Sequence, residues 1–326
     1  MAEQRFGAAL DWVRRHVDVG RLPAAVLGIT TTEGTVALDA FGASGARPAR
    51  VGDHFALFSV TKPLTGITAA REVAAGRLSA LTPLTAAVPE LLPQPAPIQL
   101  RHLVSHTAGL AEPPLDTALG LHRALRTAGS DFAAGTASRY STLAFEGVAE
   151  LIRHASGLRW TEALAAWADP IGATGLTLDP AADPHPVDDA AAAGLDMARF
   201  TALEQPGAGL LGRAEDLLAI GTELLRGGGR VLDARTLAMT LRPLTTGLPR
   251  LEPYPAERGQ DWGFSWNLRS RAPGLIAHDG YGHGGWSGSE FWVHPEVGVA
   301  YVLLTNRAQR PGVDADQLDN AIVAAA

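Results

Sequence analysis

Segments typical of β-strands lie at both ends of this chain, and segments typical of helices lie between them. Near the N-terminus, two strand-like runs in AAVLGITTTEGTVALDAFG (24–42) meet at a turn formed by Glu33 and Gly34. In the last third, Pro and Gly separate four strand-like segments, WGFSWNLR, GLIAHDGYGHGG, SEFWVHP and GVAYVLLTN. This distribution predicts an α+β fold in which both ends of the chain contribute strands to one antiparallel sheet.

The middle of the chain predicts a helical insertion into this sheet. Apolar residues recur at helical spacing in AFEGVAELIRHASG and WTEALAAWADP, with loops rich in Pro and Gly around them. Two further helices, AEDLLAIGTELLRGGG and DADQLDNAIVAAA, flank the final strands. We therefore expect a discontinuous α/β sheet domain of residues 1–75 and 207–326, flanked by helices, and an all-helical domain of residues 76–206.

Composition excludes several classes of function. The chain has no cysteine, so disulfides, thiolate metal sites and a cysteine nucleophile are excluded. A net charge of −7 gives no electrostatic footprint for nucleic acid. No apolar run approaches the roughly 18 residues needed to span a membrane. The first 20 residues lack the apolar stretch of a secretory signal, so a cytoplasmic location is expected.

One lysine stands among the 27 basic residues, and it lies in the sequence Ser59-Val-Thr-Lys62. Arginine stays protonated in proteins, whereas a buried lysine can lose its proton and act as a base. Leu64, Ile67 and Ala70 predict a helix that begins near Ser59, and Pro63 is tolerated only in its first turn. Residues three apart share a helix face, so the Ser59 hydroxyl can meet the Lys62 amine, which can activate it as a nucleophile.

The sequence around this motif resembles the family of class C β-lactamases, D-alanyl-D-alanine carboxypeptidases and related serine esterases and acyltransferases. Segments that carry the resemblance follow in order along most of the chain: FALFSVTKPLTG, LRHLVSHTAGL, RYSTLAFEGVAELIRHASG, PGAGLLGRAEDLLAIGTELLRGGG, and GHGGWSG with VAYVLLTN. The resemblance implies the fold of the β-lactamases and penicillin-binding proteins, with the active site between the sheet domain and the helical domain.

The same resemblance implies roles for residues outside the Ser59–Lys62 motif. Tyr140 matches the tyrosine of the family's Tyr-x-Asn motif, and a phenol beside a cationic amine is expected to lose its proton more easily. Thr142 stands where the family has asparagine, and His283-Gly284-Gly285 replaces Lys-Thr-Gly. These departures disfavour a substrate carboxylate and favour neutral esters or acyl groups. Thr142, His283, Gly284 and Gly285 are the expected substrate-binding residues.

The expected oxyanion hole consists of the backbone N–H groups of Ser59 and Trp286. Small residues before Trp286 would let the strand approach the substrate closely. Four tryptophans gather in this region and are candidates for an apolar wall: Trp262, Trp266, Trp286 and Trp292.

The sequence therefore predicts a serine hydrolase that forms an acyl-enzyme at Ser59, with Lys62 and Tyr140 moving its proton. An esterase or acyltransferase on a small-molecule ester is favoured, with water or an amine or alcohol as acceptor. A β-lactamase or D-Ala-D-Ala carboxypeptidase or amidase is the first alternative, and a catalytically silent ligand-binding protein is the second. No metal or organic cofactor, nucleic acid or membrane is implied.

Two other interpretations fit less well. An α/β-hydrolase would need G-x-S-x-G, which is absent, and its HGG-type segment should precede the nucleophile. His102 and His106 have the spacing of a metal pair but no third ligand, which favours a capped and packed helix end.

Overall fold

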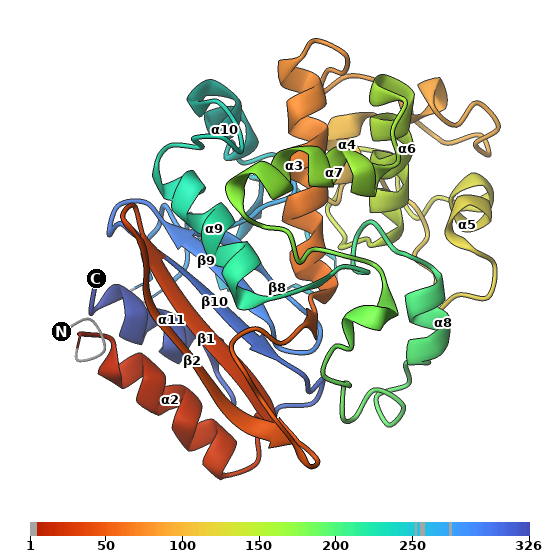
Figure 1. Ribbon diagram of the computed structural model, residues 1–326. Coiled ribbons are helices and arrows are strands. Elements are labelled where there is room, and N and C mark those ends of the chain that lie inside the picture. Colours follow the sequence, from red (N-terminus) through yellow and green to blue (C-terminus); the bar gives the residue numbers. More distant parts are fainter. Residues whose placement is uncertain (1–4, 252, 255–257, 274–275) are drawn as a thin grey trace.

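A computed structural model describes residues 5–251, 253–254, 258–273 and 276–326 (Figure 1). In these residues the strands form an eight-stranded antiparallel sheet with the order β3-β2-β1-β10-β9-β8-β7-β6, and a separate pair, β4 and β5. The strands are β1 (Ala24–Thr31), β2 (Gly34–Ser44), β3 (Arg47–Pro48), β4 (Phe55–Ala56), β5 (Leu211–Gly212), β6 (Asp261–Trp262), β7 (Asn267–Leu268), β8 (Tyr281–Gly284), β9 (Glu290–His294) and β10 (Val299–Thr305).

Strands from the two ends of the chain meet at the centre of the sheet. β1 pairs with β2 through a short turn and with β10 on its other side, in a register that sets Leu27 opposite Leu303. The predicted α+β fold with an antiparallel sheet built from both ends is confirmed.

One predicted strand is wrong in detail. WGFSWNLR is a tight hairpin of β6 and β7, in which Trp262 pairs with Asn267. Ser265 turns the chain with φ of 70°, a left-handed conformation that single-sequence patterns do not reveal for serine. Within GLIAHDGYGHGG, β8 covers the second half, and residues 274–275 lie outside the described residues.

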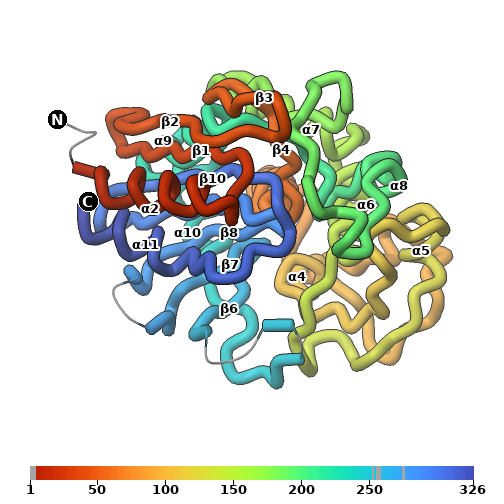
Figure 2. Tube along the Cα trace, turned by 90° about the horizontal axis from the view of Figure 1, so that it is seen from below, coloured from red at the N-terminus to blue at the C-terminus, as the bar shows by residue number. Residues whose placement is uncertain are grey.

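Helices cover both faces of the sheet (Figures 1 and 2). α2 (Gly7–Asp18) and α11 (Ala315–Val323) pack together on one face, over a core that contains Leu27 and Ile29 of β1. α9 (Ala214–Leu225) packs on the other face against β1 and β10. Gly28 permits this contact, because a Cβ there would lie 2.6 Å from Leu218 of α9. None of the described helices is both long and apolar enough to cross a membrane.

The remaining helices lie mostly beside the sheet, around α3 (Thr61–Ala74) and α6 (Leu143–Ser156), which pack against each other. The others are α4 (Leu100–Val104), α5 (Leu121–Thr127), α7 (Trp160–Ala168), α8 (Met197–Ala202) and α10 (Ala234–Thr240), with 3-10 turns η1 (Phe58–Val60), η2 (Leu84–Ala86), η3 (Asp169–Ile171) and η4 (Pro180–Ala182). α3 carries Lys62 in its first turn and is buried on nearly all sides, so it fixes this residue rigidly between the sheet and the helices.

Candidate active site

Ser59 lies in the 3-10 turn η1, which leads directly into α3. The preceding residue, Phe58, has φ of 46°, a left-handed backbone that is strained for a bulky side chain. Its buried ring is held by Phe200 and Trp286, with ring centroids 5.0 and 5.2 Å away. Such backbone strain persists only where the surrounding packing enforces it. Here it accompanies a turn that places Ser59 in the lining of a cavity.

Lys62 is fully buried, and its Nζ lies 3.1 Å from Ser59 Oγ. The same nitrogen lies 3.2 Å from Thr142 Oγ1 and 2.9 Å from the carbonyl oxygen of Gly207. Burial lowers the pKa of Lys62 from 10.5 to about 7, against the opposing charge of Glu112. A neutral amine fits these partners, because it can donate to Gly207 and Thr142 while its lone pair accepts the Ser59 proton.

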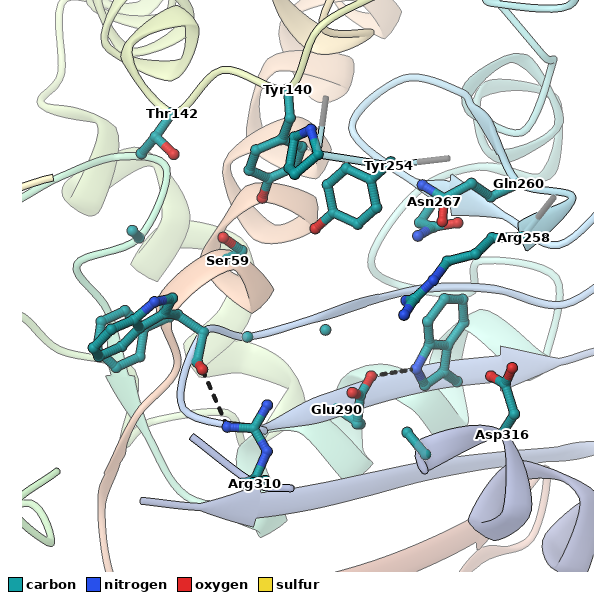
Figure 3. Close-up of a pocket in the computed structure, with 18 of the residues that line it drawn as sticks. Ser59, Tyr140, Thr142, Tyr254, Arg258, Gln260, Asn267, Glu290, Arg310 and Asp316 are labelled. Carbon is teal, nitrogen blue, oxygen red and sulfur yellow. Dashed lines mark hydrogen bonds between the residues drawn. The ribbon is translucent and has the colours of Figure 1, made fainter. Parts of the chain in front are cut away.

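Tyr140 closes the other side of the serine (Figure 3). Its ring centroid lies 4.5 Å from Lys62 Nζ. Burial, followed by the neighbouring Tyr254, raises the pKa of Tyr140 well above its usual value, although a hydrogen bond with Ser59 opposes the shift. The expectation of an easily lost phenolic proton is therefore wrong, because desolvation outweighs the effect of the amine. Tyr140 is a neutral phenol.

His283 of β8 lies behind Tyr140. Its Nδ1 lies 2.7 Å from the Gly284 carbonyl oxygen, so Nδ1 carries the proton and Nε2 is an acceptor. The Tyr140 hydroxyl donates to this Nε2 over 3.3 Å. Burial, and then the charge of Lys62, lowers the pKa of His283 to about 3. The imidazole is neutral, and it contacts the phenol instead of lining the cavity as expected.

Thr142 lies at the start of α6, and an acidic residue that the sequence did not suggest holds this turn in place. Glu112 accepts hydrogen bonds from the backbone N–H groups of Thr142 (2.7 Å) and Leu143 (3.1 Å) and from the Ser141 hydroxyl (2.6 Å). Glu112 lies in a loop, so no periodic pattern of residues distinguishes it. The one signal in the sequence was its position six residues after His106, which lies in a segment that resembles the family.

His106 was also missed as a site residue. Its ring stacks on Tyr140 with centroids 4.3 Å apart, and its Nδ1 accepts from the Ser141 backbone N–H. Burial lowers the pKa of His106 far below its usual value. His102 instead accepts from the backbone N–H of Gln99 at the start of α4, so the two histidines do not form a metal pair.

The described residues hold one cluster whose spacing could suit a metal ion, His122, Glu146 and Glu150, with ligand atoms within 4.8 Å of one another. It involves α5 and α6, and none of the three residues lines the cavity at Ser59. Arg153 already pairs with Glu150. Nothing connects this cluster to the chemistry at Ser59.

The turn after β8 brings the backbone of Trp286 toward Ser59. A Cβ on Gly285 would lie 2.6 Å from the Leu57 carbonyl oxygen, so only glycine permits this approach. Neither the N–H of Ser59 nor that of Trp286 donates to another residue in the described ranges. Two free donors beside the serine are what an oxyanion hole requires.

A cavity of about 680 Å³ opens at Ser59 (Figure 3). Trp286 and Trp292 line it, whereas Trp262 packs behind Tyr140 and Trp266 lies in the core. Of the expected substrate-binding residues, Thr142, Gly284 and Gly285 line the cavity. Other residues that line the cavity are Phe58, Leu115, Tyr254, Gln260, Asn267 and Glu290.

Fold and site together define a serine hydrolase of the β-lactamase-like type, in which Ser59 and the buried Lys62 lie one helical turn apart. The model of the Beta-lactamase family matches residues 10–326, and the chain belongs to this family. It is 28% identical to esterase EstB of Burkholderia gladioli, over 94% of this chain and 88% of that protein.

Solved structures show the same fold. The chain is similar to EstCE1, described as a hydrolase with promiscuous acyltransferase activity (TM-score 0.79, 22% identity, 99% of each chain covered). It is also similar to a penicillin-binding protein homologue of Caulobacter crescentus (TM-score 0.83, 20% identity, 99% of this chain and 98% of that one).

Proposed function

We propose that the protein is a serine esterase or acyltransferase that forms an acyl-enzyme at Ser59 on a small-molecule ester. The observation that carries this proposal is the contact between Ser59 Oγ and the buried amine of Lys62, whose pKa is lowered to about 7. A base with this pKa is half deprotonated at neutral pH and can accept the serine proton. The similarity to an esterase supports the substrate class.

In the first step, Ser59 Oγ attacks the ester carbonyl carbon while its proton passes to Lys62 Nζ. The developing oxyanion accepts hydrogen bonds from the backbone N–H groups of Ser59 and Trp286. Thr142 and Gly207 hold the lysine in place during this transfer, because both bind its nitrogen before and after it gains the proton.

In the second step, the bond to the alcohol oxygen breaks and that oxygen takes the proton of the Tyr140 hydroxyl. The phenolate recovers a proton from the Lys62 ammonium, which returns both residues to their starting state. His283 accepts a hydrogen bond from the same hydroxyl and acts as a positioning residue. Water or an alcohol or amine then attacks the acyl-enzyme by the reverse sequence.

The strand beside the serine favours neutral esters over penicillins. A penicillin carries a carboxylate, and His283-Gly284-Gly285 offers no permanent positive charge to bind it. The side chain beside Gly284 is acidic instead. A Cβ on Gly284 would lie 2.9 Å from Glu290 Oε2. Burial raises the pKa of Glu290 to about 7, so it is partly charged at neutral pH and offers a carboxylate no positive partner.

The test is a series of p-nitrophenyl esters of increasing acyl length, followed by intact-mass measurement of the protein. We expect release of nitrophenol and a transient mass increase equal to the acyl group, both absent in Ser59→Ala. Addition of an alcohol or amine distinguishes transfer from hydrolysis, since transfer yields a new ester or amide. Rapid hydrolysis of nitrocefin with slow ester turnover would favour the β-lactamase alternative. No acylation by any of these compounds would favour a silent binding protein.

A further inference from the structure

Two carboxamide side chains line the cavity at Ser59, and neither forms a side-chain hydrogen bond with another residue that the structure describes. Gln260 and Asn267 both line it and are only 1% and 6% exposed. Gln260 Nε2, Asn267 Oδ1 and the neighbouring Arg269 Nε have no hydrogen-bond partner among the residues that the structure describes. Because buried polar groups in folded proteins nearly always have a partner, two unpaired carboxamide side chains in the wall of a cavity point to a ligand that supplies one.

The charged side chains around these amides are largely satisfied already. Arg269 pairs with Asp316 over 3.2 Å, and its guanidinium lies 4.2 Å from the ring centroid of Trp292. The indole N–H of Trp292 donates to Glu290 over 2.7 Å. Arg258 also lines the cavity but is exposed, so solvent screens its charge. Since charges of both signs are present and mostly paired, the ligand group that fits here is neutral.

Other walls of the cavity are apolar. Phe58 belongs to a cluster with Ala208, and Trp286 packs against that cluster. Both aromatic residues line the cavity, as does Leu115. In Figure 3, Tyr254 lies between Ser59 and the pair of Gln260 and Asn267, and all four residues line the same cavity. A molecule bound at the serine can therefore meet an apolar wall and an amide-lined wall at once.

We infer that the preferred substrate is an ester with two unlike arms, one apolar against Phe58 and Trp286, the other bearing a neutral carboxamide that hydrogen-bonds with Gln260 and Asn267. The inference rests on the proposed function, because it takes Ser59 as the point where the two arms join. A carboxamide offers a donor and an acceptor, which complement the acceptor and the donor of each amide side chain in the cavity wall. An alkyl arm would bury these polar groups without partners, which selects against it.

Matched ester pairs test this inference. For the acyl arm, the pair is 4-nitrophenyl 4-carbamoylbutanoate and its alkyl isostere, 4-nitrophenyl 5-methylhexanoate. For the alcohol arm, it is 4-carbamoylphenyl butanoate and 4-isopropylphenyl butanoate. The measured quantity is the ratio of kcat/KM for the carboxamide ester to that for its isostere. For one of the two pairs, we expect this ratio to be about tenfold higher in the wild type than in Gln260→Met or Asn267→Leu. A change of this size corresponds to the loss of one or two hydrogen bonds. Gln94→Met removes a carboxamide outside the cavity and should leave the ratio unchanged.

Ratios that are equal in the wild type and both cavity variants, for both pairs, would overturn the inference. Binding of the same esters to Ser59→Ala, measured by calorimetry, separates it from the proposed function. If the wild type hydrolyses esters but Ser59→Ala binds both members of each pair equally, the inference fails and the esterase stands. If no ester is hydrolysed but Ser59→Ala binds a carboxamide ester about tenfold more tightly than its isostere, the amide site stands and the esterase falls. This measurement also serves where a cavity variant does not fold.

Discussion

Replacement of Lys62 by methionine tests the most demanding feature of the site, a fully buried amine with a lowered pKa. Methionine has a similar length and no charge. In the unfolded chain the amine has a pKa of 10.5, and in the folded protein about 7. Between these values the unfolded state binds about one more proton than the folded state, so the stability of the wild type rises with pH. Below pH 7 both states are protonated, and the full penalty for burying the charge applies.

The magnitude follows from the two pKa values. Linkage gives a slope approaching about 1.4 kcal/mol per pH unit inside this window and half of that at the folded pKa, so the wild type should gain about 2 kcal/mol between pH 7 and pH 9. The methionine variant lacks this titration, while groups that do not interact with the charge of Lys62 titrate equally in both proteins. The difference between the two free energies of unfolding therefore isolates the lysine.

The assay is urea unfolding of both proteins at several pH values between 6 and 9.5. We expect the free-energy difference between wild type and Lys62→Met to change by about 2 kcal/mol across pH 7 to 9 in favour of the wild type. The acylation rate of the wild type with a p-nitrophenyl ester should rise through the same pH region. Two parallel stability curves would show that the lysine keeps an ordinary pKa, and the assignment of Lys62 as the base would be refuted.

Three further variants test residues around Ser59 and Lys62. Tyr140→Phe should lower kcat by about 10² to 10³ with little change in KM, because the leaving alcohol loses its proton donor; unchanged kcat would remove the phenol from the proposed mechanism. Gly285→Ala should lower kcat/KM by at least about tenfold, since its Cβ would meet the Leu57 carbonyl oxygen at 2.6 Å and displace the oxyanion donor; stopped-flow acylation kinetics would show no change if this approach is unimportant. Glu112→Gln removes a charge that raises the pKa of Lys62, so the acidic limb of the pH–rate profile should shift to lower pH; a shift to higher pH would contradict the sign.

The fold was largely predictable because its signals are local. Strand-like patterns at both ends of the chain and helical periodicity between them specify which elements form. The pairing of β1 with β10 follows because both strands must bury their apolar faces in the same sheet. The hairpin of β6 and β7 was not predictable, since a serine in the left-handed region depends on its fit against Gly66 of α3. The proposed boundaries at residues 75 and 207 stay predictions.

Part of the candidate site was also predictable from the sequence, and part was not. The contact between Ser59 and Lys62 follows from a spacing of three on a helix, although their catalytic roles stay predictions. The raised pKa of Tyr140 did not follow, because burial in the folded protein outweighs the neighbouring amine. Glu112 and the carbonyl of Gly207 reach the site through loops, and no spacing in the sequence predicts where a loop carbonyl will lie.

The surroundings of Lys62 explain why a chain that otherwise uses arginine keeps a lysine at this position. A guanidinium would stay protonated and would bring five donors into a site that offers one carbonyl and two hydroxyl oxygens as partners. Burial lowers the pKa of the amine, and no carboxylate among the described residues pairs with it directly to restore the charge, since Glu112 acts on it only through space. The two neutral imidazoles, His106 and His283, add no negative charge that would hold the proton. A carboxylate placed against Nζ would stabilise the ammonium and prevent its proposed action as a base. The backbone carbonyl of Gly207 therefore orients the amine and leaves its pKa low, whereas an acidic side chain in its place would raise that pKa.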